Sequence, residues 1–162
     1  YLTEIHPQAE AFVRTLGEKL RRGALLLIDY GFGEREYYHP QRHMGTLMCH
    51  RAHQADDNPL VDVGAKDITA HVNFTGIALA AQEQPLPVGQ EWQLLGYTSQ
   101  AHFLINCGLP QAMERAPLQE RALAAKLLME HEMGELFHVL LLAKGAPWEA
   151  VGFAHGDRSH RL

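Results

Sequence analysis

The stretch LLLIDYGFG, residues 25–33, decides the fold, because an apolar run ends there in an abrupt polar turn that contains glycines. The continuous apolar run predicts a strand over residues 24–30 that is buried on both faces, as in a parallel sheet covered by helices. Gly31 and Gly33 do not complete the dinucleotide-binding fingerprint, since the required third glycine is missing. The turn therefore needs another explanation.

The segments around this strand alternate between helical and extended patterns. Apolar spacing predicts helices over residues 8–22, the second half of 66–85, 99–107 and 118–129, and further strands over 92–97 and 137–143. Asn73 is expected to cap the second of these helices, and Gly108 to Pro110 to end the third. Residues 46–51 are expected to form a short strand, and residues 34–45 and 55–64 to form loops. This alternation indicates an α/β sheet.

The composition narrows the classes of partner. The chain has 162 residues, a formal net charge of −5 and 46% hydrophobic residues, so a basic surface for nucleic acid is not expected. Cys49 and Cys107 lack the spacing of a disulfide scaffold or a zinc site, which favours a reducing compartment. No apolar run has the length needed to cross a bilayer, and no signal peptide is recognisable. Because the chain starts at Tyr1, we expect it to be a piece of a longer protein.

Asp29 and Tyr30 end the predicted strand, and Gly31 follows them. Ligands of open α/β sheets bind beyond the carboxyl ends of the strands, so a carboxylate here suits a cationic substrate. Gly31 would allow close approach of a ligand to the backbone. The alternative is that Asp29 caps the turn and Tyr30 packs beside it.

The segment EYYHPQR, residues 36–42, brings together Glu36, Tyr37, Tyr38 and Arg42. Aromatic rings stack on guanidinium groups, and a carboxylate can bind a guanidinium with two hydrogen bonds. These residues are therefore candidates for substrate binding. The alternative is a surface loop whose tyrosines cover the edge of the sheet.

The segment DITAHVNF, residues 67–74, places Asp67, His71 and Asn73 before a predicted helix. His71 titrates near neutral pH and suits a proton acceptor or polar clamp, with Asp67 orienting its ring. A capped helix entry explains Asn73 equally well. Another grouping, Cys49 with His50 and His53, does not have the spacing of metal ligands on one strand, so no metal site is predicted.

Several long motifs together resemble one enzyme family. The strings GALLLIDYGFGEREYYHPQRHMGTLMCHRAH, DITAHVNFT, LLGYTSQAHFLINCGL and EMGELFHVLLLAKG occur in this order along the chain. They resemble the carboxyl-terminal half of MidA-type class I S-adenosylmethionine-dependent methyltransferases. The resemblance implies an α/β fold, the late part of a Rossmann-like sheet with an inserted loop-rich segment. Residues 24–30, 92–97 and 137–143 would be its fifth, sixth and antiparallel seventh strands.

The resemblance also implies what the chain lacks. The glycine-rich loop and the acidic residue that hold the cofactor in this family have no counterpart, so residues 1–162 would form one partial domain without most of the S-adenosylmethionine cradle. The sequence departs from the family at two positions. Asn73 stands where Asp is usual, and His50 where Tyr is frequent, which weakens any role of charge at 73 or of an aromatic ring at 50.

The implied activity is methylation of a protein side chain such as arginine. Asp29 and Glu36 would hold the guanidinium, while Asp67 and His71 would act as clamp or proton acceptor. Tyr30, Tyr37, Tyr38, Arg42 and Asn73 would line the substrate site, with Gly31 beside the cofactor. Further expectations are a cytoplasmic location, a mitochondrial matrix location in eukaryotic relatives, a respiratory-complex subunit as substrate, and a homodimer. The alternatives are a non-catalytic assembly module derived from this fold and, less favoured, a metal-dependent hydrolase.

Overall fold

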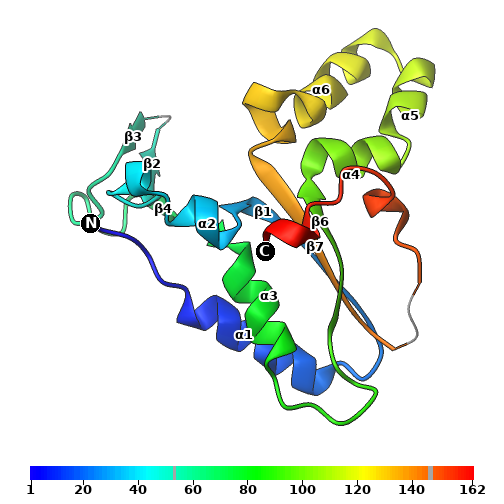
Figure 1. Ribbon diagram of the computed structural model, residues 1–162. Helices are drawn as coiled ribbons and strands as arrows, with labels where there is room; N and C mark the ends of the chain where they lie inside the picture. The colour runs from blue at the N-terminus through cyan, green and yellow to red at the C-terminus, as the bar shows by residue number, and fades with distance from the viewer. Residues whose placement is uncertain (53, 146–147) are drawn as a thin grey trace.

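Four strands form the central sheet of the computed structural model, which describes residues 1–52, 54–145 and 148–162 (Figure 1). The order is β5 (Val72–Asn73), β1 (Gly23–Phe32), β7 (Phe137–Lys144) and β6 (Gln93–Ser99). β7 runs antiparallel to β1 and β6, and β5 runs parallel to β1. The predicted α/β class and the antiparallel last strand are therefore confirmed.

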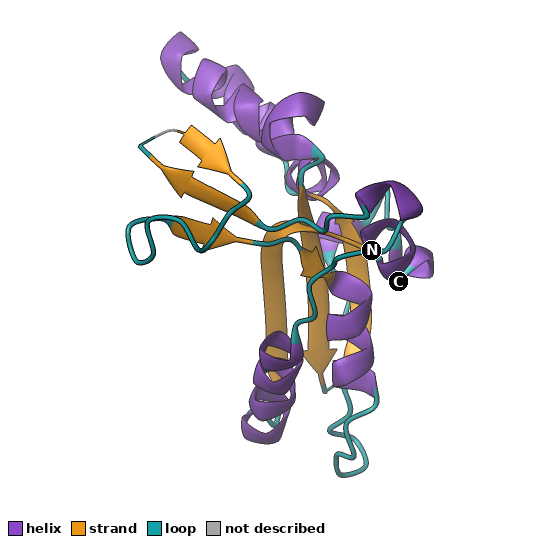
Figure 2. Ribbon diagram, turned by 90° about the vertical axis from the view of Figure 1, so that its left-hand side faces the viewer, coloured by secondary structure: helices purple, strands orange, loops and turns teal. Residues whose placement is uncertain are grey.

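Helices α1 (Pro7–Lys19) and α3 (Phe74–Gln82) pack against one face of this sheet (Figure 2). Pro7 starts α1, where its missing N–H costs no helical hydrogen bond. The core beneath them includes Phe74 and Leu140, each 0% exposed. Full burial of one such side chain stabilises the fold by about 1.5–3 kcal/mol. On the other face, Val139 and Phe153 form a second, smaller core over β6 and β7.

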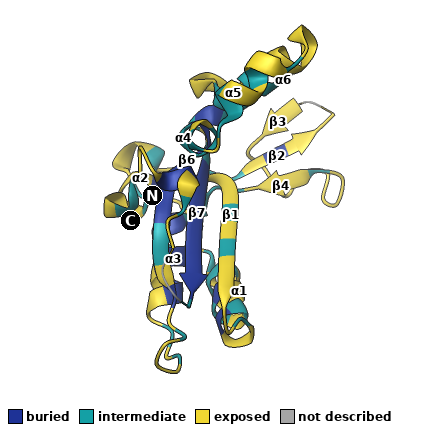
Figure 3. Cartoon of the chain, turned by 90° about the vertical axis from the view of Figure 1, so that its right-hand side faces the viewer, coloured by how far each residue is buried: buried dark blue, intermediate teal, exposed yellow. Residues whose placement is uncertain are grey.

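The prediction that the first strand is buried on both faces is wrong. Leu26, Ile28 and Tyr30 of β1 are 44%, 47% and 41% exposed, whereas β7 beside it is buried (Figure 3). In addition, β5 pairs with β1 only at Gly31 and Phe32, so within the described ranges the outer edge of β1 is unpaired over residues 23–30. An apolar run indicates how much surface a strand can bury, but it does not show which element covers that surface.

Two predicted loops contain short elements instead. Residues 34–45 form a single helical turn, α2 (Glu34–Tyr37), and a 3₁₀ turn, η1 (Pro40–Arg42). The strands β2 (Met48–Arg51), β3 (Gln54–Asp56) and β4 (Asp67–Thr69) form a separate antiparallel sheet that projects from the central one (Figure 2). The short strand predicted over 46–51 is thus confirmed, while the loop predicted over 55–64 is wrong at its first two residues.

Three helices and a π-helical turn connect β6 to β7. They are α4 (Gln100–Asn106), α5 (Leu109–Arg115), α6 (Leu118–Leu128) and the π-helical turn η2 (Glu130–Gly134). Gly108 ends α4 with a φ of +86°, as predicted, but α5 begins directly after it and was not predicted. The 3₁₀ turns η3 (Val151–Phe153) and η4 (Ser159–Arg161) follow β7. Of the helices in the described ranges, none has the length and apolarity required to span a bilayer.

Candidate functional site

Three strand ends meet at one edge of the central sheet. Tyr30 near the end of β1 lies opposite Phe137 at the start of β7, and Ser99 at the end of β6 lies opposite His138. Because β7 is antiparallel to its neighbours, its first residues share this edge with the last residues of β1 and β6. Open α/β sheets bind ligands at this edge, so the functional groups gathered here form the candidate site.

Four rings gather at the end of β1 and form what we call the aromatic cluster: Tyr30, Phe32, His71 and Phe137. The centroid of Tyr30 lies 3.9 Å from that of Phe137 and 5.9 Å from that of His71, to which it is nearly parallel. The ring of Phe32 lies 5.1 Å from His71. Since Tyr30 is 41% exposed, the cluster presents an aromatic face at the surface. Tyr30 thus occupies the place at the strand end that the sequence predicts.

A guanidinium group of the chain itself already lies on this cluster. The Cζ atom of Arg42 is 3.9 Å from the ring centroid of Phe32. Its Nη2 lies 3.4 Å from Oε1 of Glu36, and its Nε donates to the backbone oxygen of Glu36 over 3.1 Å. Glu36 therefore has a partner within the chain, and its role in substrate binding stays a prediction.

His71 is a half-buried member of the aromatic cluster. Burial and the charge of Arg42 lower the pKa of His71, while the charges of Glu4 and Asp29 oppose this shift. Its Nδ1 is buried and has no hydrogen-bond partner among the described residues. The ring is therefore neutral at neutral pH and offers a nitrogen to accept a proton.

Asp67 does not orient His71, contrary to the prediction. Asp67 is exposed on β4, where it lies opposite His50 in the projecting sheet. The acid of the predicted set whose charge reaches His71 is Asp29. Asp29 is exposed at the edge of the sheet, and its Oδ1 accepts a hydrogen bond from the backbone N–H of Tyr30 over 2.8 Å. Of the predicted acids, Asp29 is therefore the one whose charge acts on His71, although Glu4 acts on it more strongly.

Tyr37 belongs to the core and does not line a substrate site, which corrects its predicted role. The residue is 1% exposed, and its hydroxyl lies 2.8 Å from Nε2 of His6 and donates to Oε2 of Glu4 over 3.1 Å. Burial and the charge of Glu4 raise the pKa of Tyr37, so the phenol stays protonated. Tyr38 packs edge-on against this ring, with centroids 5.0 Å apart.

Gly31 and Asn73 serve local structure. Gly31 is buried, and a Cβ atom there would collide with the carbonyl oxygen of Val72 and the ring of Phe74, so its missing side chain makes room for β5 and not for a cofactor. Asn73 caps α3, as predicted, by accepting a hydrogen bond from the N–H of Gly76 over 3.3 Å.

A cavity of about 670 Å³ opens beside the aromatic cluster, and we call it the arginine pocket. Its lining combines basic, aromatic and imidazole groups from distant parts of the chain: Gly33, Arg35, Glu36, His39, Tyr97, His138, Arg158, His160, Arg161 and Leu162. Apart from Glu36, none of these side chains was singled out from the sequence. They meet only because the carboxyl-terminal segment folds back over the ends of β1 and β6.

His138 is a buried polar group of the arginine pocket. It is 7% exposed, and its ring is nearly parallel to that of Tyr97 at a centroid distance of 5.2 Å. Burial and the charge of Arg158 lower the pKa of His138, more than Glu135, Glu36 and a hydrogen bond to the backbone of Gly31 raise it. Its Nδ1 is buried without a partner among the described residues. The pocket thus contains a neutral imidazole with an unused nitrogen.

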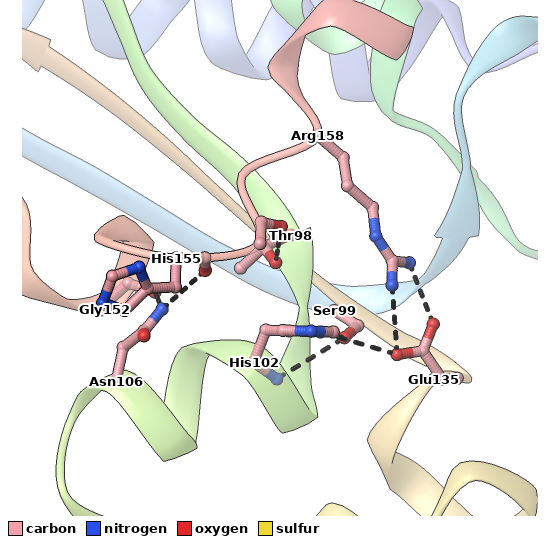
Figure 4. Close-up of polar contacts among 9 residues, drawn as sticks. Thr98, Ser99, His102, Asn106, Glu135, Gly152, His155 and Arg158 are labelled. Carbon is pink, nitrogen blue, oxygen red and sulfur yellow. Dashed lines mark hydrogen bonds and ion pairs between the residues drawn. The ribbon is translucent and has the colours of Figure 1, made fainter.

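The wall of the pocket formed by the carboxyl-terminal segment is firmly attached. The backbone N–H of Arg158 donates to the carbonyl of Tyr97 over 2.6 Å, and the Thr98 hydroxyl donates to the carbonyl of Gly156 over 2.7 Å. Arg158 also pairs with both carboxylate oxygens of Glu135, at 2.9 and 3.3 Å (Figure 4). Burial raises the pKa of Glu135, but the hydrogen bonds from Arg158 and Ser99 lower it below its usual value.

No metal centre is found in the part of the chain that the structure describes, where no three His, Cys, Asp or Glu side chains come close enough to bind an ion. Cys49 is buried and Cys107 is exposed, and both are free thiols. His53, which the sequence groups with Cys49 and His50, lies outside the described residues.

Comparison with known proteins gives matches that agree with this arrangement. A family model described as "Putative S-adenosyl-L-methionine-dependent methyltransferase" matches residues 1–91. The crystal structure of an uncharacterized protein from Burkholderia thailandensis matches 100% of this chain and 44% of its own chain, with 47% identity and a TM-score of 0.91.

A second structure from the same organism, described as a "likely methyl transferase" bound to S-adenosyl-homocysteine, matches 99% of this chain and 42% of its own, with 47% identity and a TM-score of 0.88. The present chain therefore spans less than half the length of either structure. No protein with curated annotation matches it.

Proposed function

The chain belongs to a family of S-adenosyl-L-methionine-dependent methyltransferases, and we propose that it forms the methyl-acceptor side of such an enzyme. The observation that carries this proposal is the convergence of three strand ends on the aromatic cluster and the arginine pocket, at the edge where α/β sheets bind ligands. The relative that binds S-adenosyl-homocysteine supports the same cofactor here.

The residues described do not fit the cofactor on their own. The space beside Gly31 is occupied by Val72 and Phe74. The arginine pocket contains three arginines, whose charges repel a sulfonium cation. We therefore place most of the cofactor site in the part of the longer relatives that this chain does not match. The residues of the chain bind and orient the methyl acceptor.

The two neutral histidines are candidates to accept the proton that a nitrogen atom loses when it is methylated. An amine or guanidinium nitrogen that gains a methyl group releases a proton, and a neutral imidazole with a free nitrogen accepts it. The lowered pKa values keep both His71 and His138 neutral at neutral pH. The aromatic cluster shields the acceptor from water and limits its orientation.

The acceptor is proposed to be a protein side chain, and arginine is the candidate that local chemistry favours. Arg42 shows that a guanidinium fits between the ring of Phe32 and the acceptor oxygens of Glu36. An arriving arginine would find the same stacking on Tyr30, which is exposed. The respiratory-complex substrate, the cytoplasmic location and the homodimer stay predictions.

Methyl transfer by the full-length protein tests the function. Purified protein is incubated with S-adenosylmethionine carrying a tritiated methyl group and with a protein extract, and the labelled amino acid is identified after hydrolysis. Tyr30→Ala is expected to lower the rate by about tenfold or more, because the acceptor loses its orienting ring, while cofactor binding stays unchanged. Trp148→Ala is the matched control, since Trp148 is exposed and belongs neither to the aromatic cluster nor to the arginine pocket.

The outcomes separate the alternatives. Label on a residue other than arginine would overturn the arginine substrate and leave the methyltransferase in place. A full-length protein that neither binds S-adenosylmethionine nor transfers label would favour the non-catalytic assembly module. An unchanged rate in Tyr30→Ala would remove the aromatic cluster from the acceptor site.

A further inference from the structure

Building on the proposed function, we infer that the arginine pocket binds an oxyanion, a carboxylate or a phosphate, that the methyl acceptor carries beside the methylated group. The substrate class would thus be a side chain flanked by an acidic group.

The charged residues that line the pocket favour a ligand with a negative charge. Three arginines face one carboxylate, Glu36, which is already paired with Arg42. Arg158 is paired with Glu135, so it acts mainly as a fixed wall. The two other arginines, Arg35 and Arg161, are exposed, and neither forms an ion pair within the ranges described. Guanidinium groups with this freedom bind carboxylates and phosphates through paired hydrogen bonds.

His138 adds a buried imidazole to the lining of the arginine pocket. His138 is more than nine-tenths buried, and its Nδ1 has no partner among the described residues. A bond between its ring and the backbone of Gly31 leaves Nδ1 as the acceptor.

The position of the pocket links the oxyanion to the methylated group. The ring of His138 lies 6.3 Å from that of Phe32, so the pocket and the aromatic cluster are neighbours. Glu36 lines the pocket and also pairs with the guanidinium over Phe32. One acceptor can therefore place its methylated group on the cluster and an adjacent acidic group between Arg35 and Arg161.

Small probes of opposite charge test the inference on the full-length protein. Benzoate and benzamidine share a planar ring with a forked polar group but carry opposite charges, and phenyl phosphate offers a phosphate on the same ring. Calorimetric titration is expected to show binding of benzoate or phenyl phosphate and none of benzamidine. The two anions distinguish a carboxylate from a phosphate as the natural group.

Matched variants locate the binding. The double variant Arg35→Gln/Arg161→Gln is expected to weaken anion binding by about tenfold or more, since both unpaired guanidinium groups are lost and neutral amides cannot replace their charge-assisted hydrogen bonds. The control is Arg21→Gln/Arg115→Gln, which removes two exposed arginines outside the pocket. The control should bind the anions as the unmodified protein does, and all four substitutions are at exposed positions, so folding should be preserved.

Three results would overturn the inference: no binding of either anion, binding of benzamidine in their place, or an equal loss of binding in the control variant. Its failure is distinguishable from failure of the proposed function. Methyl transfer without anion binding would leave the enzyme in place and remove the oxyanion, whereas anion binding without methyl transfer would do the reverse.

Discussion

At the scale of single residues, Glu4 near the amino end forms hydrogen bonds with residues more than 30 positions away in the sequence. Its carboxylate accepts hydrogen bonds from the backbone N–H groups of Thr46 and Leu47, at 2.8 and 2.7 Å, and from the hydroxyl of Tyr37 at 3.1 Å. Burial raises the pKa of Glu4, but these hydrogen bonds together lower it below its usual value. The residue thus fastens the segment before β2 to the amino-terminal segment.

Glu4→Gln is expected to lower the free energy of unfolding by about 1–3 kcal/mol at pH 7, because charge-assisted bonds are lost in a half-buried site. A lowered pKa in the folded state means that the unfolded state binds more protons as the pH falls. The stabilisation by Glu4 is therefore complete above the pKa of the unfolded state, near the ordinary value of 4.5, and is lost as the pH falls through the pKa of the folded state.

Urea unfolding from pH 7 to pH 3 measures this effect. The difference between the unmodified protein and Glu4→Gln should shrink toward acid pH. Glu18→Gln, at an exposed position on α1, should change stability little at any pH. A constant difference across the range would mean that the charge of Glu4 contributes nothing.

At the scale of single elements, the start of α3 allows a test of whether Asn73 is only a helix cap or also a functional residue. Asn73 accepts a hydrogen bond from the N–H of Gly76 at the start of this helix. Asn73→Ala should cost about 1 kcal/mol of stability. Asn73→Asp should be neutral or slightly stabilising, since both residues cap well and a negative charge suits a helix amino terminus.

Chemical unfolding of both variants, with Gln82→Ala at the exposed far end of α3 as control, measures the capping contribution. Methyl-transfer rates of the same variants then separate a cap from a charged site residue. A large change of rate in Asn73→Asp, with stability unchanged, would show that position 73 contacts the reacting groups.

Local patterns predicted most elements and little of the site. Apolar spacing identifies α1, α3, α4 and α6, and continuous apolar runs identify β6 and β7, because each pattern lies within one segment. The arginine pocket draws on residues 33–39, 97, 138 and 158–162, which no local pattern joins. His138 lies within an apolar strand, and from the sequence pattern alone its side chain would be expected in the hydrophobic core. Only the folded structure shows that its ring lines a cavity.

At the scale of the whole molecule, two parts extend away from the central sheet. The sheet β3-β2-β4 projects on one side, and helices α5 and α6 extend above the end of β6 (Figures 1 and 2). Both carry exposed apolar side chains, with Leu60 at 81% and Leu118 at 80% exposed. The edge that holds the aromatic cluster lies between them, so a protein acceptor would reach the site past both extensions.

The open edge of β1 has a consequence for handling this chain as an isolated polypeptide. Over residues 23–30 its outward N–H and C=O groups pair with no described strand, and Leu26 and Ile28 are exposed beside them. Such an edge is a template for pairing with a second copy. The isolated 162-residue chain is therefore expected to aggregate in a concentration-dependent way, with thioflavin fluorescence that rises over time.

Ile28→Lys should slow this aggregation severalfold, because a lysine on an edge strand opposes the approach of another copy. Leu79→Lys is the control, since Leu79 is 43% exposed but lies on helix α3. If both variants aggregated at the unmodified rate, β1 would not be the nucleating segment. If only Ile28→Lys slowed the aggregation, the strand that carries Tyr30 would also set how long the isolated polypeptide stays in solution.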